Sequence, residues 1–145
     1  MKTSCLIRVS ALLLFGSSIC AAQAQKLRAV TVKNVTGHYR LTKDEFRNRL
    51  DLQQVTGGKI KFYLVALWVS HYNPDNIHNG ELNGVLALQN GIAVYDQDAC
   101  KLKFEFFSNR VRVTQLNDEG CGFGANVTAA GTYRKLDSKQ PKFDF

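Results

Sequence analysis

Beyond residue 24, the sequence lacks both a long apolar run and a clear helical pattern. A helix that crosses a membrane needs roughly 20 consecutive apolar residues, so we expect no helical membrane span in this part of the chain. The best helical candidate, 41–52, also fits a strand, because Leu50 and Leu52 alternate with charged residues. We therefore expect a short turn or helical piece at 42–45 and a strand from about 46 to 55.

Motifs of catalysis and of metal or phosphate binding are also missing. There is no G-x-S-x-G, no H-E-x-x-H, no C-x-x-C and no phosphate-cradling glycine loop. The histidines have no metal-site spacing, and the paired carboxylates Asp96/Asp98 and Asp118/Glu119 stand in polar turns, where we expect them to be solvated. We therefore predict that the protein is not an enzyme and has no catalytic residues, no metal site and no cofactor.

The N-terminus has the pattern of a cleavable secretory signal. Lys2 and Arg8 give a positive start, 9–19 is almost wholly apolar or small, and Ala22-Gln23-Ala24 matches an A-x-A cleavage site. We expect cleavage after Ala24 and a periplasmic or secreted product. Residues 1–24 are thus predicted to be a signal peptide, and 25–145 a single antiparallel β domain that is long enough to bury a core.

Few cysteines remain after this cleavage. Cys5 and Cys20 leave with the signal, and Cys100 and Cys121 stay. A pair in an oxidising compartment is typical of a disulfide. A metal site would need two further ligands at short spacing, and a redox pair would need a C-x-x-C motif. We therefore expect a Cys100–Cys121 disulfide that closes a loop of about 20 residues and contributes about 3 kcal/mol.

Two hairpins can be aligned from turn chemistry and from alternation of apolar residues. The first has its turn at Thr56-Gly57-Gly58, and the second has a two-residue turn at Ser108-Asn109. The expected pairs in the first are Val55–Lys59, Leu52–Phe62, Leu50–Leu64 and Phe46–Trp68, the last three on one face. The expected pairs in the second are Phe106–Val111 and Phe104–Val113 inside, and Glu105–Arg112 outside.

A third hairpin is indicated by Asn90-Gly91, between 82–88 and 92–95, although apolar residues occur on both of its sides. Further strands are expected near 26–33, at 38–41 and at 131–136, and no internal repeat stands out. About eight short strands predict an all-β fold, a small antiparallel barrel or sandwich with one disulfide. Outward lysines and arginines would cost roughly 2–4 kcal/mol each near the middle of a bilayer, so we expect no membrane-spanning barrel.

Two segments are the best candidates for binding. The first is a polar loop over 69–80, which carries His71, Tyr72, Asn73 and His78, since long loops on a rigid scaffold often bind partners. The second surrounds Phe123, where glycines allow close approach of the backbone. A spacer loop and a tight chain crossing are the alternatives for these two segments.

The charge balance is basic, with a formal net charge of +7 that includes two cations of the signal. Lys101, Lys103, Arg110 and Arg112 form a basic stripe on one hairpin face, interrupted by Glu105. Because the neighbouring aromatics point inward, stacking platforms for nucleic acid are missing. We expect no nucleic acid as partner; anionic cell-wall material remains an alternative to a protein.

The chain resembles small secreted bacterial β-barrel proteins of the periplasmic lysozyme-inhibitor type. The likeness rests on the signal, the mature length, the pair Cys100 and Cys121, and a late G-x-Y at Gly131 and Tyr133. No inhibitor loop can be matched, so no site residue is carried over, and the basic charge departs from what an inhibitor of a cationic lysozyme would favour.

From size, disulfide, export and missing catalytic motifs, we expect a non-catalytic binding protein that contacts another envelope or secreted protein as an inhibitor or immunity factor. The alternative is a β-barrel that binds a small ligand or an anionic envelope polymer. The two classes differ in their response to salt, because polymer binding should weaken as salt is added.

Overall fold

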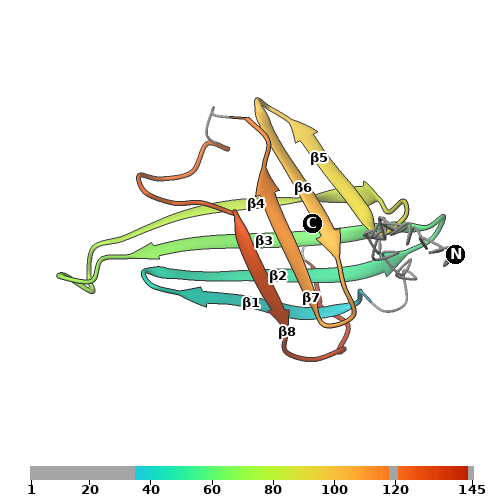
Figure 1. The fold of residues 1–145 in the computed structure, drawn as a ribbon, viewed down its shortest axis with the longest axis horizontal. Helices are drawn as coiled ribbons and strands as arrows, with labels where there is room; N and C mark the ends of the chain where they lie inside the picture. Colours follow the sequence, from blue (N-terminus) through green and yellow to red (C-terminus); the bar gives the residue numbers. More distant parts are fainter. Residues whose placement is uncertain (1–34, 118–120, 144–145) are drawn as a thin grey trace, which may run out of the picture.

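The computed structural model describes residues 35–117 and 121–143, so the expected signal peptide and the strand expected near 26–33 lie outside the described residues. The described part is all β, and it forms one eight-stranded antiparallel sheet that curls into a nearly closed barrel (Figure 1). The strands are β1 (Gly37–Lys43), β2 (Phe46–Val55), β3 (Lys59–Val69), β4 (Ile77–Ala87), β5 (Ile92–Gln97), β6 (Cys100–Phe106), β7 (Arg110–Gln115) and β8 (Gly131–Lys135).

The order of strands in the sheet is β4-β3-β2-β1-β8-β7-β6-β5. Strands β1–β4 form one half, strands β5–β8 form the other, and the halves cross at a steep angle (Figure 1). The first and last strands, β1 and β8, join the halves. This arrangement settles the choice between a barrel and a sandwich in favour of a nearly closed barrel.

The predicted hairpin registers are confirmed. Leu52 pairs with Phe62, Leu50 with Leu64 and Phe46 with Trp68 across β2 and β3, and all three pairs of β6 and β7 are as expected. These registers follow from alternation, because a slip of one residue would turn the apolar side chains of one strand to solvent. The turn expected at 42–45 is shorter and not helical, since β1 runs to Lys43 and β2 starts at Phe46.

The prediction of a third hairpin is wrong: the turn at Asn90-Gly91 forms, but the strands on its two sides do not pair with each other. Asn90 and Gly91 both have positive φ, and Gln89 and Ile92 exchange two backbone hydrogen bonds of 2.9 Å. Beyond this one bridge the ladder stops, because β4 pairs with β3 along its length and β5 pairs with β6. The steep crossing of the halves separates β4 from β5, which are the two edges of the sheet.

Large side chains from both halves meet inside the barrel. The Phe62 ring centroid lies 5.6 Å from that of Tyr95 and 5.4 Å from that of Phe104. Gly84 leaves room for this cluster, because a Cβ at that position would lie 3.2 Å from Phe62. Burying such side chains contributes about 1.5–3 kcal/mol each, and the cluster fixes the spacing of the halves.

Candidate functional site

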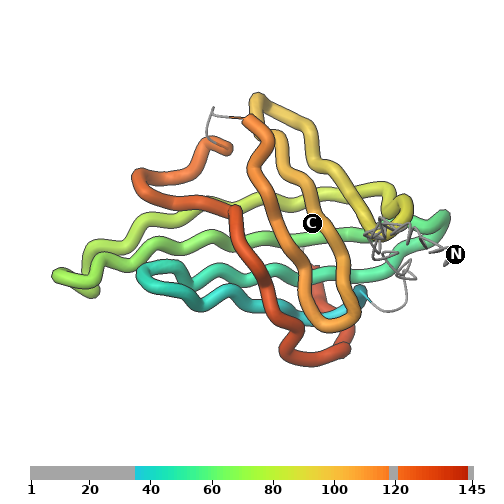
Figure 2. Tube along the Cα trace, in the orientation of Figure 1, coloured from blue at the N-terminus to red at the C-terminus, as the bar shows by residue number. Residues whose placement is uncertain are grey.

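The hairpin of β3 and β4 projects from one end of the barrel (Figures 1 and 2). Pairing between β2 and β3 ends at Phe46 and Trp68, whereas pairing between β3 and β4 continues to Val69 and Ile77. The connection is residues 70–76, shorter than the loop expected over 69–80. The expectation was too long because Ile77 and His78 look like loop residues by composition, yet they extend the ladder of β4.

Internal hydrogen bonds hold the 70–76 loop in one shape. Ser70 Oγ accepts hydrogen bonds from the backbone N–H groups of Tyr72 and Asn73, both at 3.3 Å. Asn73 closes the turn at both of its ends, because its carbonyl accepts from Asn76 N at 2.9 Å and its Oδ1 accepts from Asp75 N at 3.1 Å. The predicted site residue Asn73 is therefore placed as a turn-forming residue.

His71 and Tyr72 lie at the tip of this loop. Tyr72 is 94% exposed, the largest exposure among the exposed large hydrophobic side chains of the described residues. Its ring meets the His71 ring edge-on, with 5.5 Å between centroids. An aromatic side chain with so little protein contact is available to bury area against a partner.

Glu45, in the turn between β1 and β2, braces the projecting hairpin. Its carbonyl accepts from Val69 N at 2.9 Å, and its carboxylate accepts from Trp68 Nε1 at 3.2 Å and from His71 N at 3.4 Å. The sequence prediction missed Glu45 as a site residue and included Trp68 only as a strand residue. The register of Phe46 opposite Trp68 was the available signal, because it places the Glu45 turn beside the tip.

His78 lies on the inner face of β4 and not in the loop. Its ring stacks on Trp68 with 5.3 Å between centroids, and its Nδ1 donates a hydrogen bond of 2.6 Å to the Ala125 carbonyl. His78 therefore joins the hairpin to the segment 121–127. A structural role accounts for all of these contacts.

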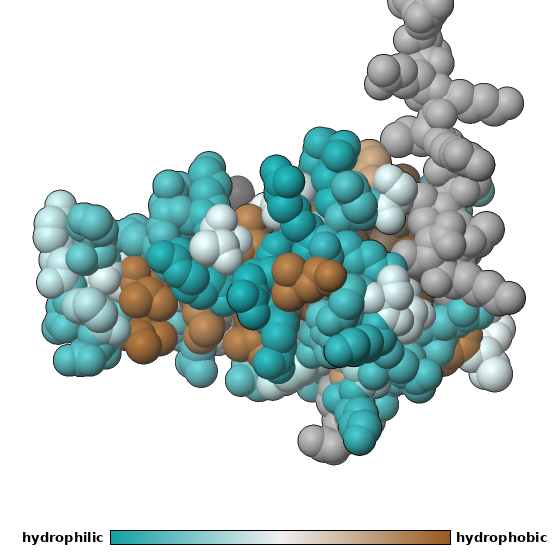
Figure 3. Space-filling view, turned by 90° about the horizontal axis from the view of Figure 1, so that it is seen from below, coloured by the Kyte–Doolittle hydropathy of each residue, from teal (hydrophilic) through white to brown (hydrophobic). Residues whose placement is uncertain are grey.

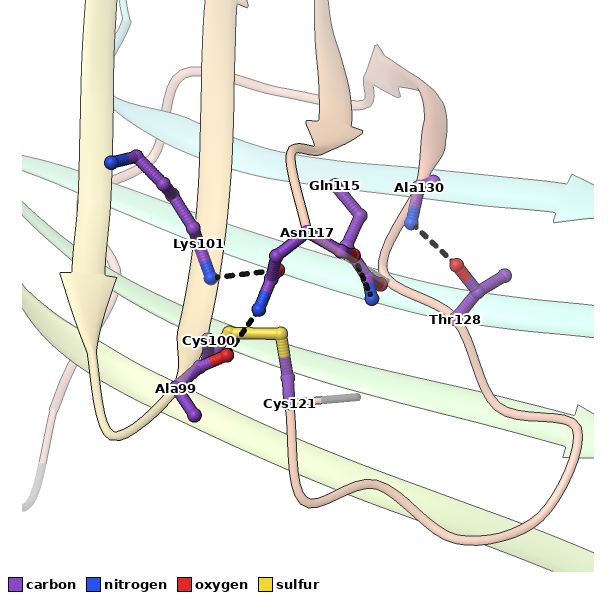
Figure 4. The surroundings of a disulfide bond; sticks show 8 residues. All are labelled: Ala99, Cys100, Lys101, Gln115, Asn117, Cys121, Thr128 and Ala130. Atoms are coloured by element: carbon purple, nitrogen blue, oxygen red, sulfur yellow. Dashed lines mark hydrogen bonds between the residues drawn. A yellow bond between two sulfur atoms is a disulfide. The ribbon is translucent and has the colours of Figure 1, made fainter. Parts of the chain in front are cut away.

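Phe123 belongs to the same junction. The segment 121–127 starts at the Cys100–Cys121 disulfide (Figure 4) and runs beside β4 (Figure 2), where Gly124 N donates to Asn79 O at 3.0 Å. Phe123 packs against Gly80, because a Cβ there would overlap the ring. The structure thus brings His78 and Phe123 together at the base of the hairpin and places His71, Tyr72 and Asn73 at its tip.

Hydrogen bonds reinforce the disulfide on the β6 side (Figure 4). Asn117 Oδ1 accepts from Lys101 N at 3.2 Å, and Asn117 Nδ2 donates to the Ala99 carbonyl. Gln115 Nε2 donates to the Asn117 carbonyl at 3.1 Å. These bonds hold residues 115–117 at the end of β7 against β6, and the disulfide anchors the start of the 121–127 segment to β6.

A hollow with a volume of about 580 Å³ lies at the other end of the barrel. It is lined by Thr36, Gln53, Gln54, Val55, Thr56 and Gln140, none of which titrates. Acid–base chemistry therefore has no group to use at this hollow.

Within residues 35–117 and 121–143, no group of three or more His, Cys, Asp or Glu side chains is placed to hold a metal ion. The same ranges contain no helix long and apolar enough to cross a membrane. Comparison with models of protein families, with curated proteins and with solved structures finds no match to this chain.

Proposed function

We propose that this protein is an exported, non-catalytic binding protein that acts by protein–protein contact, as an inhibitor or immunity factor. The contact surface is the tip of the β3–β4 hairpin, with Tyr72 as its anchor. The observation that carries the proposal is the 94% exposure of Tyr72 on a hairpin that projects beyond the barrel.

Tyrosine is enriched among the residues that dominate binding energy, because a rigid ring buries a large area at a low entropic cost. The Tyr72 backbone N–H is held by Ser70 Oγ, and the loop closes on itself through Asn73. A loop held in its bound shape loses less conformational entropy on association, so more of the contact energy appears as affinity.

Contacts at the base of the hairpin also support its use as a protein contact, because they hold it rigid. Glu45 holds Trp68 and His71, and Trp68 stacks on His78. A narrow, rigid projection fits a concave site of a partner, such as the cleft of an enzyme. An apolar ligand inside the barrel is the less favoured function, because Phe62, Tyr95 and Phe104 meet across the interior.

The test is site-specific crosslinking in the cell envelope. The protein is produced from its full sequence with a photo-crosslinking phenylalanine analogue at position 72, or at position 94 as a matched control. Val94 is 44% exposed and lies on β5, away from the tip. We expect one discrete protein adduct from position 72 and none from position 94.

The partner is then identified, and its activity is measured with the parent protein and with Tyr72→Ala. Inhibition by the parent that weakens at least tenfold in the variant supports the proposal, since losing one anchor residue costs about 2 kcal/mol or more. Equal adducts from both positions, or equal inhibition by both proteins, would place the contact elsewhere and contradict it.

A further inference from the structure

Four arginines form a row across four neighbouring strands. Arg49 of β2 pairs with Arg40 of β1, Arg40 pairs with Arg134 of β8, and Arg134 pairs with Arg110 of β7. All four are exposed on the outer face of the barrel. Neighbouring strands lie about 4.8 Å apart, so the row spans about 14 Å.

The row crosses the seam where the two halves of the barrel meet. Figure 3 views the molecule from below Figure 1, the side on which β1 and β8 lie, and hydrophilic side chains dominate the middle of this face. Tyr72 and Ile77 belong to the tip of the β3–β4 hairpin, which contributes no residue to the row, whereas the exposed Leu116 and Leu136 directly follow β7 and β8. The row is therefore separate from the proposed protein contact.

The central pair of the row has no acidic partner. Arg49 contacts Asp51 at 3.3 Å, and the Arg110 guanidinium lies 4.6 Å from the Phe107 ring centroid. In the part of the chain that the structure describes, no carboxylate lies within ion-pairing distance of Arg40 or Arg134.

The lysines of the basic stripe expected from the sequence, unlike Arg40 and Arg134, have acidic partners. Lys101 Nζ lies 2.6 Å from Asp96, and Lys103 Nζ lies 3.5 Å from Glu105. Both lysines are thus compensated by carboxylates of their own or the neighbouring strand. Arg40 and Arg134, in contrast, have no such carboxylate among the described residues.

A motif that occurs twice in the sequence positions the two central arginines, Arg40 and Arg134. Gly-x-Tyr-Arg occurs at Gly37–Arg40 and again at Gly131–Arg134. In both copies the tyrosine hydroxyl donates to the carbonyl four residues earlier, at 2.9 Å from Tyr39 and 2.7 Å from Tyr133. Each tyrosine is buried and anchored, and the next residue points outward, so the two copies present Arg40 and Arg134 side by side.

Like charges directly opposite one another destabilise a sheet. The central pair, Arg40 and Arg134, therefore costs stability unless an anion neutralises it, whereas Arg49 already contacts Asp51. The guanidinium group has a planar fork that binds phosphate oxygens through two parallel hydrogen bonds, and it is more weakly hydrated than an ammonium group. The row thus matches several phosphates at close, regular spacing.

We propose that the row Arg49–Arg40–Arg134–Arg110 binds a linear polymer of phosphate groups. A flexible chain can follow the row around the seam, where β1 and β8 share only two register pairs. A flat lipid surface would reach only part of a row that bends around the barrel. This site is independent of Tyr72, and its test does not depend on the proposed protein contact.

The probe is long-chain inorganic polyphosphate, and binding is measured from about 50 to 200 mM salt. The parent should bind with an affinity that falls linearly with salt on a log–log scale, because bound phosphates release counterions. The variant Arg40→Gln/Arg134→Gln should bind at least tenfold more weakly. The slope of the logarithm of its binding constant against the logarithm of the salt concentration should be shallower by about 2, since each lost phosphate contact lowers this slope by about 1.

The matched control is Lys101→Gln/Lys103→Gln, which removes the same formal charge from compensated positions. We expect less than a threefold loss of affinity in this control. The arginine variant should melt no lower than the parent, because it removes a like-charge contact and no hydrogen bond. Its unchanged melting would show that lost binding is not lost folding.

Three outcomes would overturn the inference. The two variants could weaken binding equally, in which case net charge alone explains it. Polyglutamate could bind as tightly as polyphosphate, which removes the assignment to phosphate. Vesicles containing phosphatidylglycerol could bind more tightly than polyphosphate through the same arginines, which assigns the row to a membrane surface instead.

Discussion

Asn48 of β2 and Tyr133 of β8 share a hydrogen bond inside the barrel, with 3.1 Å between Asn48 Nδ2 and the phenolic oxygen. The same Nδ2 donates to the Thr128 carbonyl at 2.8 Å, and Asn48 Oδ1 accepts from Leu67 N at 2.9 Å. Tyr133 donates to the Ala129 carbonyl at 2.7 Å. Asn48 thus takes the place of a backbone group in the β2–β3 ladder and ties both halves of the barrel together.

Replacing Asn48 with leucine should destabilise the protein strongly. The change leaves Leu67 N without its acceptor and the Thr128 carbonyl without its donor, and each buried group left unpaired costs about 1–3 kcal/mol. We expect the free energy of unfolding to fall by about 2–4 kcal/mol, measured by urea denaturation. Asn83→Leu is the matched control, because Asn83 is exposed on β4, and a comparable loss in it would contradict this role of Asn48.

Removing the disulfide should weaken the global fold and free the 121–127 segment. Cys100 and Cys121 are 21 residues apart, and closing a loop of that length contributes about 3 kcal/mol in the chain-entropy model. The Cys100→Ala/Cys121→Ala variant should lose about that much stability. Hydrogen exchange at Gly124 N should also accelerate more than exchange at β2 amides, because the bond of Gly124 to Asn79 O depends on the anchor.

Reduction provides the control for that experiment. Dithiothreitol should lower the stability of the parent toward that of the double variant, and it should leave the variant unchanged. If the double variant is as stable as the oxidised parent, the bond does not contribute in the way the loop length predicts.

Local features of the sequence were enough to predict most of the fold. The registers of the β2–β3 and β6–β7 hairpins follow from turn length and from alternation within about 20 residues, because both act on neighbouring segments. The disulfide followed from the number of cysteines. In contrast, the separation of β4 and β5 on the two sides of Asn90-Gly91 depends on how the two halves cross, and no local pattern contains that information.

The features that depend on distant residues were missed for the same reason. Two of the three partners of Asn48, Thr128 and Tyr133, lie 80 and 85 residues away in the sequence. The arginine row needs the pairing of the first strand with the last, which brings Arg40 beside Arg134. Of the predicted site residues, His71, Tyr72 and Asn73 lie together at the tip, whereas His78 and Phe123 lie at the base, where the disulfide brings the 121–127 segment.

Gly80 and Phe123 should be energetically coupled. A Cβ at Gly80 would overlap the Phe123 ring, so Gly80→Ala should displace the 121–127 segment and cost about 1–3 kcal/mol. In a Phe123→Ala background the two closest ring atoms, Cδ1 and Cγ, are gone and only the Cβ of residue 123 remains, at 2.8 Å, so the added Cβ should cost at least 1 kcal/mol less. Urea denaturation of both single variants and the double variant gives the coupling energy, and strictly additive losses would show that the two residues do not meet.

The buried phenols of Tyr39 and Tyr133 predict that stability declines in alkali. Burial raises the pKa of both above the ordinary value of 10, and in Tyr133 the hydrogen bond from Asn48 offsets part of this rise. Above pH 10 the unfolded chain therefore loses protons that the native state keeps, and the free energy of unfolding falls by up to about 1.4 kcal/mol per pH unit for each phenol. The contribution is fully present below pH 10. Urea denaturation from about pH 8 to 11 should show this decline in the parent and a shallower one in Tyr39→Phe/Tyr133→Phe.

The variant should be less stable at neutral pH, because both hydroxyls donate to backbone carbonyls. An equally steep decline in both proteins would mean that the two phenols ionise alike in the native and unfolded states.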